Sequence, residues 1–340
     1  MERAVRAVVA LLAISCLTLL AACQSGAGSD ERADPSGSAA ATDTFPVTVE
    51  HAFGSTTIEE KPTRIATWGF GSTDAVLALG VVPVAIPQQL YGGDENGLLP
   101  WIGEKLDELG GEAPAMLSNP DGSTVPYEEI AEAAPDVILA NYSGITQEQY
   151  DTLTKIAPVV AYPDQPWTTP WRDVVTTVGQ VMGQSEQAAE LISSTEQEIA
   201  DRAKEYPQLQ GKTVAAVWDT PDGFYVYRAA DPRVEFLTDL GLTSAPSVDE
   251  LATGDSSFYY TLSTERVSEL TSDVLLVYAD SQQSADTFLA RPYAKSMEQV
   301  QQDHVALAIG QEFVAAVSPP TVLSLTWGLD SYLEALAEAV

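Results

Sequence analysis

The sequence predicts an α/β protein made of two lobes that are joined by a single long helix. Short apolar runs typical of strands alternate with helical runs, and this order indicates parallel α/β layers. One helical pattern, residues 185–206, is longer than any other and lies in the middle of the chain. The alternation resumes after Gly211. We therefore expect an N-terminal lobe over residues 45–184 and a C-terminal lobe over residues 207–340.

The predicted N-terminal lobe begins with a hairpin and continues as strand–helix units. Val47 and Val49 alternate with polar residues, which predicts a strand, and Gly54-Ser55 turns the chain toward a partner strand. Gly80 ends the first predicted helix. The further expected strands are 64–67, 81–86, 137–140 and 159–162, and the expected helices are 72–79, 127–134, 147–156 and 171–182.

The joining helix and the C-terminal lobe follow from the same kind of pattern. Ser185 is a candidate N-cap, and apolar residues recur at helical spacing as far as Ala203. The expected strands of the second lobe are 214–217, 223–227, 274–278 and 305–309, and its expected helices are 234–240, 263–270 and 321–339.

The first 22 residues have the pattern of an export signal. Arg3 and Arg6 precede an apolar run at 7–20, which is shorter than the ~20 residues of a membrane span. The ending Leu-Ala-Ala-Cys resembles a bacterial lipobox, which implies that Cys23 is lipidated, with palmitate, and becomes the first mature residue. The alternatives are an ordinary signal peptide and, less favoured, a transmembrane anchor.

Residues 23–44 predict a flexible tether between the lipid and the folded region. They are rich in Gly, Ser, Ala and Asp, and nothing in them offsets the entropy of ordering. Cys16 and Cys23 are the two cysteines, so the region after Cys23 has no thiol for a disulfide or a nucleophile. We expect an extracytoplasmic protein that is anchored to the cell membrane through Cys23.

The charge of the chain excludes several partners. There are 49 acidic against 16 basic residues, and the net charge is −33. Nucleic-acid binding depends on Lys and Arg contacts to phosphate, and anionic lipid surfaces attract basic segments. A chain this acidic is therefore not expected to bind nucleic acid or to adhere directly to anionic lipid. The acidity indicates either solubility at a cell surface or attraction of a cationic ligand.

Three segments carry a family resemblance: residues 45–86, 127–163 and 263–280, including Ala-Pro-Asp-Val-Ile-Leu at 134–139. Together they resemble the solute-binding lipoproteins of bacterial ABC importers for iron–siderophores, cobalamin and haem. The resemblance extends from Phe45 to the C-terminus and is looser after Gly211. It implies two lobes bridged by one helix that hinges little, with the ligand in the cleft between the lobes.

Residues that follow the predicted strands are the candidates for lining this cleft, because strand ends face the crevice in such sheets. Most are aromatic, which suits a bulky, partly apolar ligand, although each is equally well explained as a core aromatic. The candidates are Trp68, Phe70, Tyr142, Ser143, Trp218, Tyr227, Arg228 and Tyr278, with Trp101 added from the irregular stretch 98–103. Arg228 would donate to a carbonyl or hydroxamate oxygen, or else form a surface salt bridge.

The resemblance also implies one permease-docking glutamate in each lobe. Glu128 and Glu265 each begin a predicted helix that precedes a strand, and Glu129 is an alternative to Glu128. The plainer explanation is an acidic residue that is favourable near a helix N-terminus.

Metal binding and catalysis find little support in the sequence. His51 and His304 are the only histidines and lie far apart, and no Gly-x-Ser-x-Gly or Gly-Lys-Ser/Thr motif occurs. His51 also precedes the first α/β unit, away from the expected cleft, which disfavours an axial role toward haem.

We therefore expect a monomeric, lipid-anchored binding protein that captures a ferric siderophore and delivers it to an ABC permease. The scarcity of basic residues favours a neutral or cationic hydroxamate complex. Iron would arrive chelated, so no resident cofactor or metal ligand is expected. The alternatives are haem or cobalamin binding and, from another class, a cell-surface hydrolase.

Overall fold

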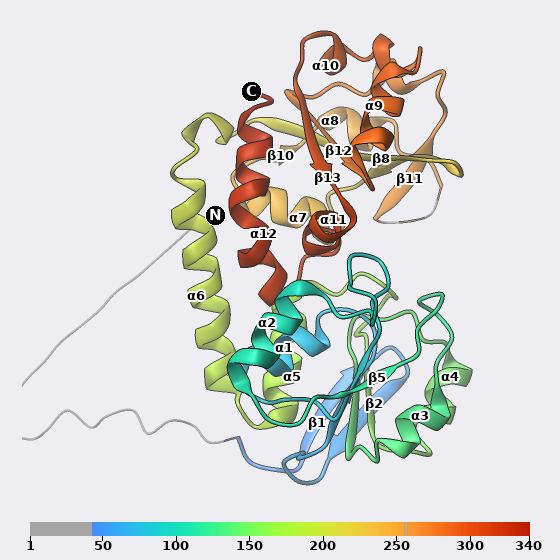
Figure 1. Ribbon diagram of the computed structural model, residues 1–340, viewed down its shortest axis with the longest axis vertical. Coiled ribbons are helices and arrows are strands. Elements are labelled where there is room, and N and C mark those ends of the chain that lie inside the picture. The colour runs from blue at the N-terminus through green and yellow to red at the C-terminus, as the bar shows by residue number, and fades with distance from the viewer. Residues whose placement is uncertain (1–42, 255, 257) are drawn as a thin grey trace, which may run out of the picture. The chain divides into compact units, whose positions relative to one another are not determined.

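Two sheets flanked by helices organise the protein, as the computed structural model shows (Figure 1). The structure describes residues 43–254, 256 and 258–340, all of which belong to one compact unit. The export signal, Cys23 and nearly all of the expected tether lie outside the described residues. The prediction of an α/β fold with two lobes is confirmed.

The N-terminal lobe contains a five-stranded parallel sheet with the strand order β5-β4-β3-β6-β7. A hairpin of β1 (Val47–His51) and β2 (Gly54–Ile58) precedes it, as predicted. The sheet strands are β3 (Ile65–Thr67), β4 (Ala85–Pro87), β5 (Ala115–Leu117), β6 (Val137–Ala140) and β7 (Val159–Ala161). The helices are α1 (Ser72–Ala78), α2 (Pro100–Leu109), α3 (Tyr127–Glu132), α4 (Gln147–Leu153) and α5 (Trp171–Met182).

Three segments of this lobe differ from the prediction. The strand expected at 81–86 forms only as β4 (Ala85–Pro87), and residues 81–83 are irregular. Residues 98–103 were expected to be irregular, but α2 begins at Pro100 and includes residues 100–103. Its first turn accommodates Pro100 because the first helical amides need no partner. Strand β5 was not predicted, because it follows Gly110-Gly111 and Pro114, which are typical of a loop.

The long joining helix is present as α6 (Ser185–Ala203), 19 residues in length. One face of α6 is buried, including Ala188, Ile199 and Ala203, and it packs on α5 and on the terminal helix α12 (Val322–Ala337). Figure 1 shows α6 and α12 side by side. Because α12 also contacts α1 and α2, it is a second connection between the lobes.

The C-terminal lobe has a six-stranded mixed sheet with the order β11-β9-β8-β12-β13, in which β10 also pairs with β8. The strands are β8 (Thr213–Thr220), β9 (Gly223–Tyr227), β10 (Thr243–Ser244), β11 (Tyr259–Leu262), β12 (Val274–Ala279) and β13 (Val305–Ile309). The remaining helices are α7 (Pro232–Asp239), α8 (Pro246–Glu250), α9 (Gln282–Ala290), α10 (Glu298–Gln301) and α11 (Gln311–Val317).

The predicted helix at 263–270 is wrong. Only a single 3₁₀ turn, Val267–Glu269, forms there. Val267 and Leu270 are both fully buried, and the backbone of Leu270 is already extended toward β12. One tight turn places both apolar side chains in the core, so no longer helix is needed.

Both lobes fix their first parallel strand in the same way. The Asp136 carboxylate accepts hydrogen bonds from the Thr63 amide at 2.7 Å and the Thr63 hydroxyl at 2.9 Å. The Asp273 carboxylate accepts from the amide and hydroxyl of Thr213, both at 2.7 Å. The residue after each aspartate enters the neighbouring strand of its sheet, β6 or β12. The two lobes are therefore equivalent at these positions.

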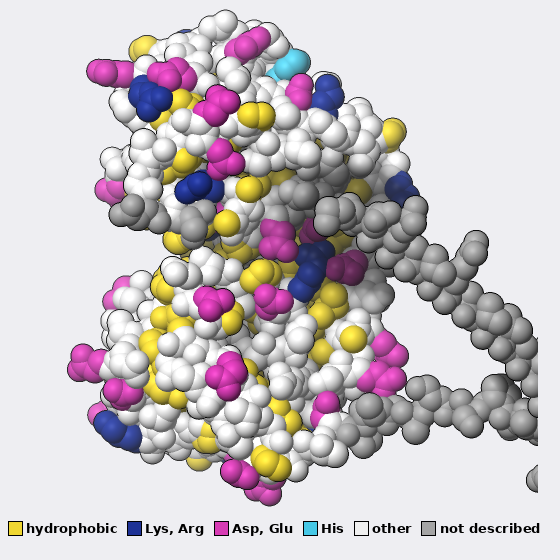
Figure 2. All heavy atoms as spheres, turned by 180° about the vertical axis from the view of Figure 1, so that it is seen from behind, with side chains coloured by type: hydrophobic (Ala, Val, Ile, Leu, Met, Phe, Trp, Pro, Cys, Tyr) yellow, Lys and Arg dark blue, Asp and Glu magenta, His cyan; other side chains and the backbone are white. Residues whose placement is uncertain are grey.

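The surface reflects the acidic composition. Figure 2 shows Asp and Glu side chains spread over the face in view, with few Lys and Arg among them. Within the part of the chain that the structure describes, every helix is too short or too polar to span a bilayer.

Candidate functional site

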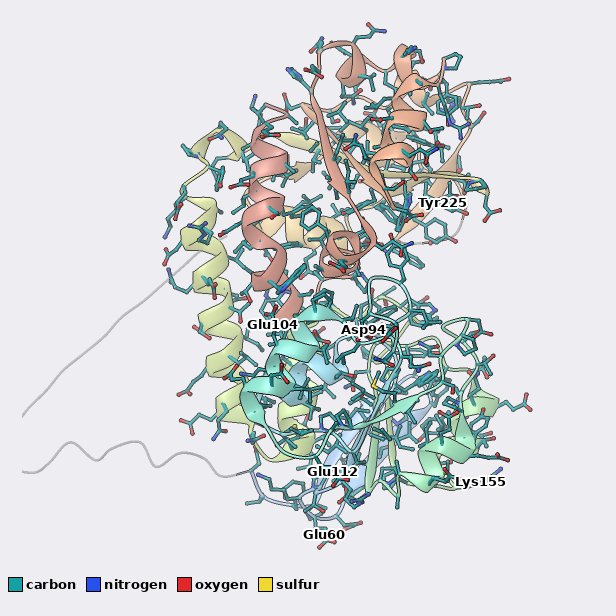
Figure 3. All side chains as sticks on the ribbon, viewed as in Figure 1. Glu60, Asp94, Glu104, Glu112, Lys155 and Tyr225 are labelled. Atoms are coloured by element: carbon teal, nitrogen blue, oxygen red, sulfur yellow. The ribbon has the colours of Figure 1, made fainter. Side chains whose placement is uncertain are left out.

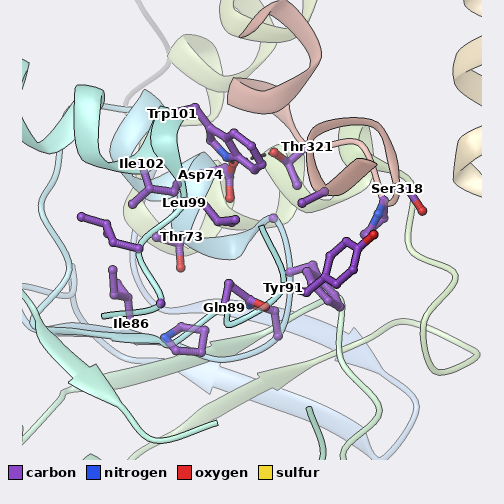
Figure 4. A pocket seen from close by; sticks show the side chains of 18 residues that line it. Thr73, Asp74, Ile86, Gln89, Tyr91, Leu99, Trp101, Ile102, Ser318 and Thr321 are labelled. Carbon is purple, nitrogen blue, oxygen red and sulfur yellow. Dashed lines mark hydrogen bonds between the residues drawn. The ribbon is translucent and has the colours of Figure 1, made fainter. Parts of the chain in front are cut away.

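Two adjoining hollows lie where the strand ends of the two lobes meet. The first, the inner cavity, has a volume of about 190 Å³ and is lined by residues of both lobes, among them Phe70, Asp74, Tyr91, Trp101, Ser318 and Thr321 (Figure 4). The second, the aromatic pocket, has a volume of about 280 Å³ and is lined by Trp218, Thr220, Tyr225, Tyr227, Arg233, Phe258 and Tyr259. Figure 3 shows Tyr225 at the edge of the C-terminal lobe that faces the N-terminal lobe.

Two contacts join the hollows to each other. The Arg233 Nε donates to the Ser318 hydroxyl at 2.6 Å, and each of these residues lines a different hollow. The rings of Tyr91 and Trp218, from opposite lobes, have their centroids 6.1 Å apart. The two hollows therefore form one candidate binding cleft.

The N-terminal wall depends on a close backbone approach at Gly69. Gly69 has φ +89°, and a Cβ there would lie 2.3 Å from the Tyr142 carbonyl oxygen. The next amide, that of Phe70, donates to the same oxygen at 2.9 Å. As a result the Phe70 ring packs against Tyr142 and Trp167, with both centroids at 5.9 Å.

The C-terminal wall is built around the Arg233 guanidinium. It lies 4.4 Å above the centre of the Tyr227 ring, and its Nη1 donates to the Asp231 carboxylate at 2.6 Å. Burial alone would lower the pKa of Arg233, but the Asp231 carboxylate raises it, so the guanidinium stays charged. The wall thus presents aromatic rings and one cation whose charge Asp231 largely balances.

Asp231 places Arg233 at this position through local sequence chemistry. Asp231 is the N-cap of α7, its side chain accepts from the Arg233 amide at 2.9 Å, and Pro232 occupies the first helical position. The helix therefore begins directly behind β9 and projects Arg233 into the cleft.

Four of the predicted ligand residues line the hollows. Phe70 and Trp101 line the inner cavity, and Trp218 and Tyr227 line the aromatic pocket. Three others, Tyr142, Ser143 and Tyr278, are buried, and Tyr142 and Tyr278 pack behind the lining aromatics. The Ser143 hydroxyl donates to the Ala140 carbonyl, so it supports the loop after β6.

Trp68 and Arg228 do not line either hollow, which corrects the expectation for both. Trp68 is 2 % exposed and packs in the core with Ala66, because side chains two residues apart share one face of a strand. The Arg228 guanidinium donates to the Ser256 carbonyl at 3.1 Å and lies 3.5 Å from Asp249. The cleft arginine is Arg233, five residues further along the chain.

The sequence reasoning also missed Tyr91, Trp167 and Asp74. Tyr91 lies in the connection between β4 and α2, and its hydroxyl donates to Asp280 of the other lobe at 2.6 Å. Arg233 was also missed, and the Asp231-Pro232 pair, which is typical of a helix start, was the sequence feature that could have indicated it. For Tyr91 and Trp167, which lie in irregular segments, we find no signal in the sequence.

Glu128 and Glu265 are exposed carboxylates at matching positions in the two lobes. Each precedes the strand-fixing aspartate, Asp136 or Asp273, by the same eight residues. Glu129 instead accepts from both the amide and the hydroxyl of Ser118, each at 2.7 Å. Glu129 is therefore engaged within its own lobe, whereas Glu128 is available.

A metal centre is not evident in the described residues. They include no group of three or more His, Cys, Asp or Glu side chains that could hold a metal ion. The His51 Nε2 lies 2.9 Å from the Thr56 hydroxyl, and its ring packs against Tyr150. His51 is not among the residues that line the two hollows.

Comparisons with known proteins agree with this arrangement. A family model described as periplasmic binding protein matches residues 65–310. The probable siderophore-binding lipoprotein YfiY of Bacillus subtilis (strain 168) is 29 % identical over 237 residues, 68 % of each chain.

Solved structures of binding proteins are also similar to this chain. PiaA of Streptococcus pneumoniae TIGR4, crystallised in complex with ferrichrome, is 36 % identical, with 86 % of this chain and 98 % of that chain covered and a TM-score of 0.77. A periplasmic solute binding protein from Mycobacterium smegmatis is 29 % identical, with the same coverage and a TM-score of 0.72.

Proposed function

The chain belongs to the periplasmic binding protein family, and we propose that it captures a ferric siderophore of the hydroxamate type and delivers it to an ABC importer. The relatives named for siderophore binding and for a ferrichrome complex support this assignment. The proposed role is capture and release without a chemical step, and the iron enters as part of the ligand.

One observation carries the choice of ligand class: the aromatic pocket contains a single cation, Arg233. Among the described residues that line the two hollows, no other Lys or Arg is present. A guanidinium matches hydroxamate oxygens as a fork of donors, and aromatic rings suit the apolar chains around them. A strongly anionic catecholate or citrate complex would need several cations, and Asp231 already balances this one.

A pair of arginines allows a controlled test. Arg233→Gln should weaken binding of ferrichrome by about tenfold to a hundredfold, the usual effect of losing a hydrogen bond to a charged group. Arg228→Gln removes the same charge five residues away and should leave the affinity unchanged, since Arg228 contacts Ser256 and Asp249. Titration calorimetry measures both. Equal effects of the two changes, or tight binding of ferric catecholate by the wild type, would contradict the assignment.

The handover to the permease is proposed to use Glu128 and Glu265. Their support is the matched position of two exposed carboxylates, one in each lobe, as described above. Two equivalent charges suit a transporter with two similar halves, where such pairs set register and association rate.

The protein is proposed to work as a monomer anchored by lipid on Cys23. The support is the Leu-Ala-Ala-Cys sequence and the lipoprotein name of a relative. Stable anchoring requires more than one acyl chain.

A further inference from the structure

Asp74 places a buried carboxyl group at the end of the inner cavity. Its side chain is 3 % exposed, and its Oδ1 accepts hydrogen bonds from the Trp101 Nε1 at 2.8 Å and from the Thr321 hydroxyl. Figure 4 shows these three side chains together at one end of the cavity, with Tyr91 and Ser318 toward the other. Among the described residues, no side chain donates to the second oxygen, Oδ2, although the backbone amide of Asp74 itself also donates to the carboxyl group.

The surroundings of Asp74 do not balance its charge. The cavity wall is largely apolar, with Phe70, Ile86, Leu98, Leu99 and Ile102, and no Lys, Arg or His occurs among the described lining residues. An ionised carboxylate in such a site is costly unless a cation pairs with it. Hydroxamate oxygens are themselves acceptors, so the iron centre of the ligand cannot satisfy Asp74.

We propose that the inner cavity receives a cationic side arm of the ligand, a primary ammonium group on an alkyl chain, with Asp74 as its counter-ion. This inference rests on the proposed capture of a ferric hydroxamate, and it adds the charge of the preferred ligand. The iron centre lies in the aromatic pocket, and the arm enters past Tyr91 and Ser318, where the hollows adjoin. A cavity of about 190 Å³ has room for about six groups of water size, which matches a short alkylammonium chain.

A purely structural role for Asp74 is the competing explanation. Its two hydrogen bonds join α1 to α2 and to the start of α12, and a neutral acceptor would serve that purpose equally well. Asp74→Asn keeps an acceptor oxygen and removes only the charge, so it separates the two roles.

Two probes that share one iron centre test the proposal. The ferric complex of ferrioxamine B carries a primary ammonium on a five-carbon chain, and its N-acetylated form lacks that charge. Quenching of tryptophan fluorescence should show the wild type binding the ammonium probe about tenfold to a hundredfold more tightly. Asp74→Asn should bind both probes with the affinity that the wild type has for the acetylated one.

A matched variant controls for the general field of the protein. Asp222→Asn removes the same charge from an exposed turn between β8 and β9, beside the aromatic pocket, and should retain the full preference for the ammonium probe.

The preference should also depend on pH. Burial raises the pKa of Asp74 to about 6, against the lowering effect of its hydrogen bonds to Thr321 and Trp101. Preference for the ammonium probe should therefore fall as the pH drops through this value, while the acetylated probe is unaffected. Tyr91 is the other titratable residue that lines the cavity, and burial and Asp280 raise its pKa well above this range. Beyond the cavity, Arg233 contacts the lining residue Ser318 and forms an ion pair with Asp231, and Glu104 of α2 lies against Trp327, which packs on Trp101.

The outcomes separate the two proposals. Equal affinity of the wild type for both probes would overturn the ammonium site and leave hydroxamate capture standing, and so would binding of ferrichrome alone. Failure of all hydroxamate complexes to bind would overturn both.

Discussion

Asp74 is a cleft residue whose buried charge opposes stability, and the proposed ammonium site would give that charge a role in binding. Its carboxyl group is buried next to apolar side chains, so its charged form is disfavoured in the folded protein. Carboxyl groups with such shifted pKa values cluster at functional sites, where the cost of burial is balanced by the rest of the fold.

The pKa of Asp74 predicts a specific pH dependence of stability. A pKa raised from 3.8 to about 6 means that the folded state is favoured fully below pH 3.8 and loses this stabilisation as the pH rises through about 6. Without ligand, Asp74→Asn should therefore be more stable than the wild type at pH 7.5, by up to about 3 kcal/mol. Urea unfolding at several pH values measures the difference, and a difference that is constant from pH 4 to 8 would contradict the buried charge.

The cleft residues show which side-chain placements can be predicted from sequence. Position after a strand selected Phe70, Trp218 and Tyr227, and all three line the hollows. The same rule failed for Trp68. Position after a strand predicts at which end of the sheet a residue lies, but not on which face its side chain lies, and Trp68 packs on the same core face as Ala66. Arg228 was predicted from its position at a strand end. The position of the Arg233 side chain instead depends on the Asp231 N-cap, which orients the first turn of α7.

Part of the secondary structure was predictable from the hydrophobic pattern, and part was not. The alternation of strands and helices and the long helix α6 followed from the hydrophobic pattern. The turn at Val267–Glu269 and the strand β5 depend on tertiary contacts, which a short segment does not encode by itself. The second connection through α12 also could not be predicted, because nothing in an apolar terminal helix says which lobe it contacts.

The loop between β3 and α1 predicts a large effect of a small substitution. Gly69→Ala would place a Cβ 2.3 Å from the Tyr142 carbonyl oxygen, so the loop must move and carry Phe70 with it. Gly80 has a similar φ of +84° with nothing within 4 Å, which makes Gly80→Ala the matched control for backbone strain alone.

Gly80→Ala should cost about 1–2 kcal/mol of unfolding free energy, the usual penalty for a left-handed residue with a Cβ. Gly69→Ala should cost clearly more, and it should also weaken ligand binding. Denaturant unfolding and fluorescence titration measure the two effects. Equal losses of stability would mean that the close approach to Tyr142 has no energetic weight.

At the scale of the whole molecule, several contacts cross between the two lobes. Arg172 of α5 forms ion pairs with Glu196 of α6 and with Glu235 and Asp239 of α7. Tyr91 reaches Asp280, and Thr321 reaches Asp74. Together with α6 and α12, these contacts favour small movements of the lobes over wide opening.

Delivery to the permease should depend on the paired glutamates. The double change Glu128→Gln and Glu265→Gln should keep ligand affinity near the wild-type value and lower siderophore uptake by cells, more clearly than either single change because such rim charges are individually weak. Glu186→Gln with Glu298→Gln, two exposed glutamates without this proposed role, is the charge-matched control. Normal uptake at low ligand concentration in cells that carry the Glu128→Gln, Glu265→Gln variant would contradict the docking role. Loss of ligand binding in that purified variant would also contradict it.

The central claim is that the cleft binds a ferric hydroxamate, and the most direct test is native mass spectrometry of the protein purified from its own iron-starved cells. We predict one added mass per chain that corresponds to a ferric hydroxamate siderophore and is lost on unfolding. Added mass of haem, cobalamin or a ferric catecholate would contradict the claim.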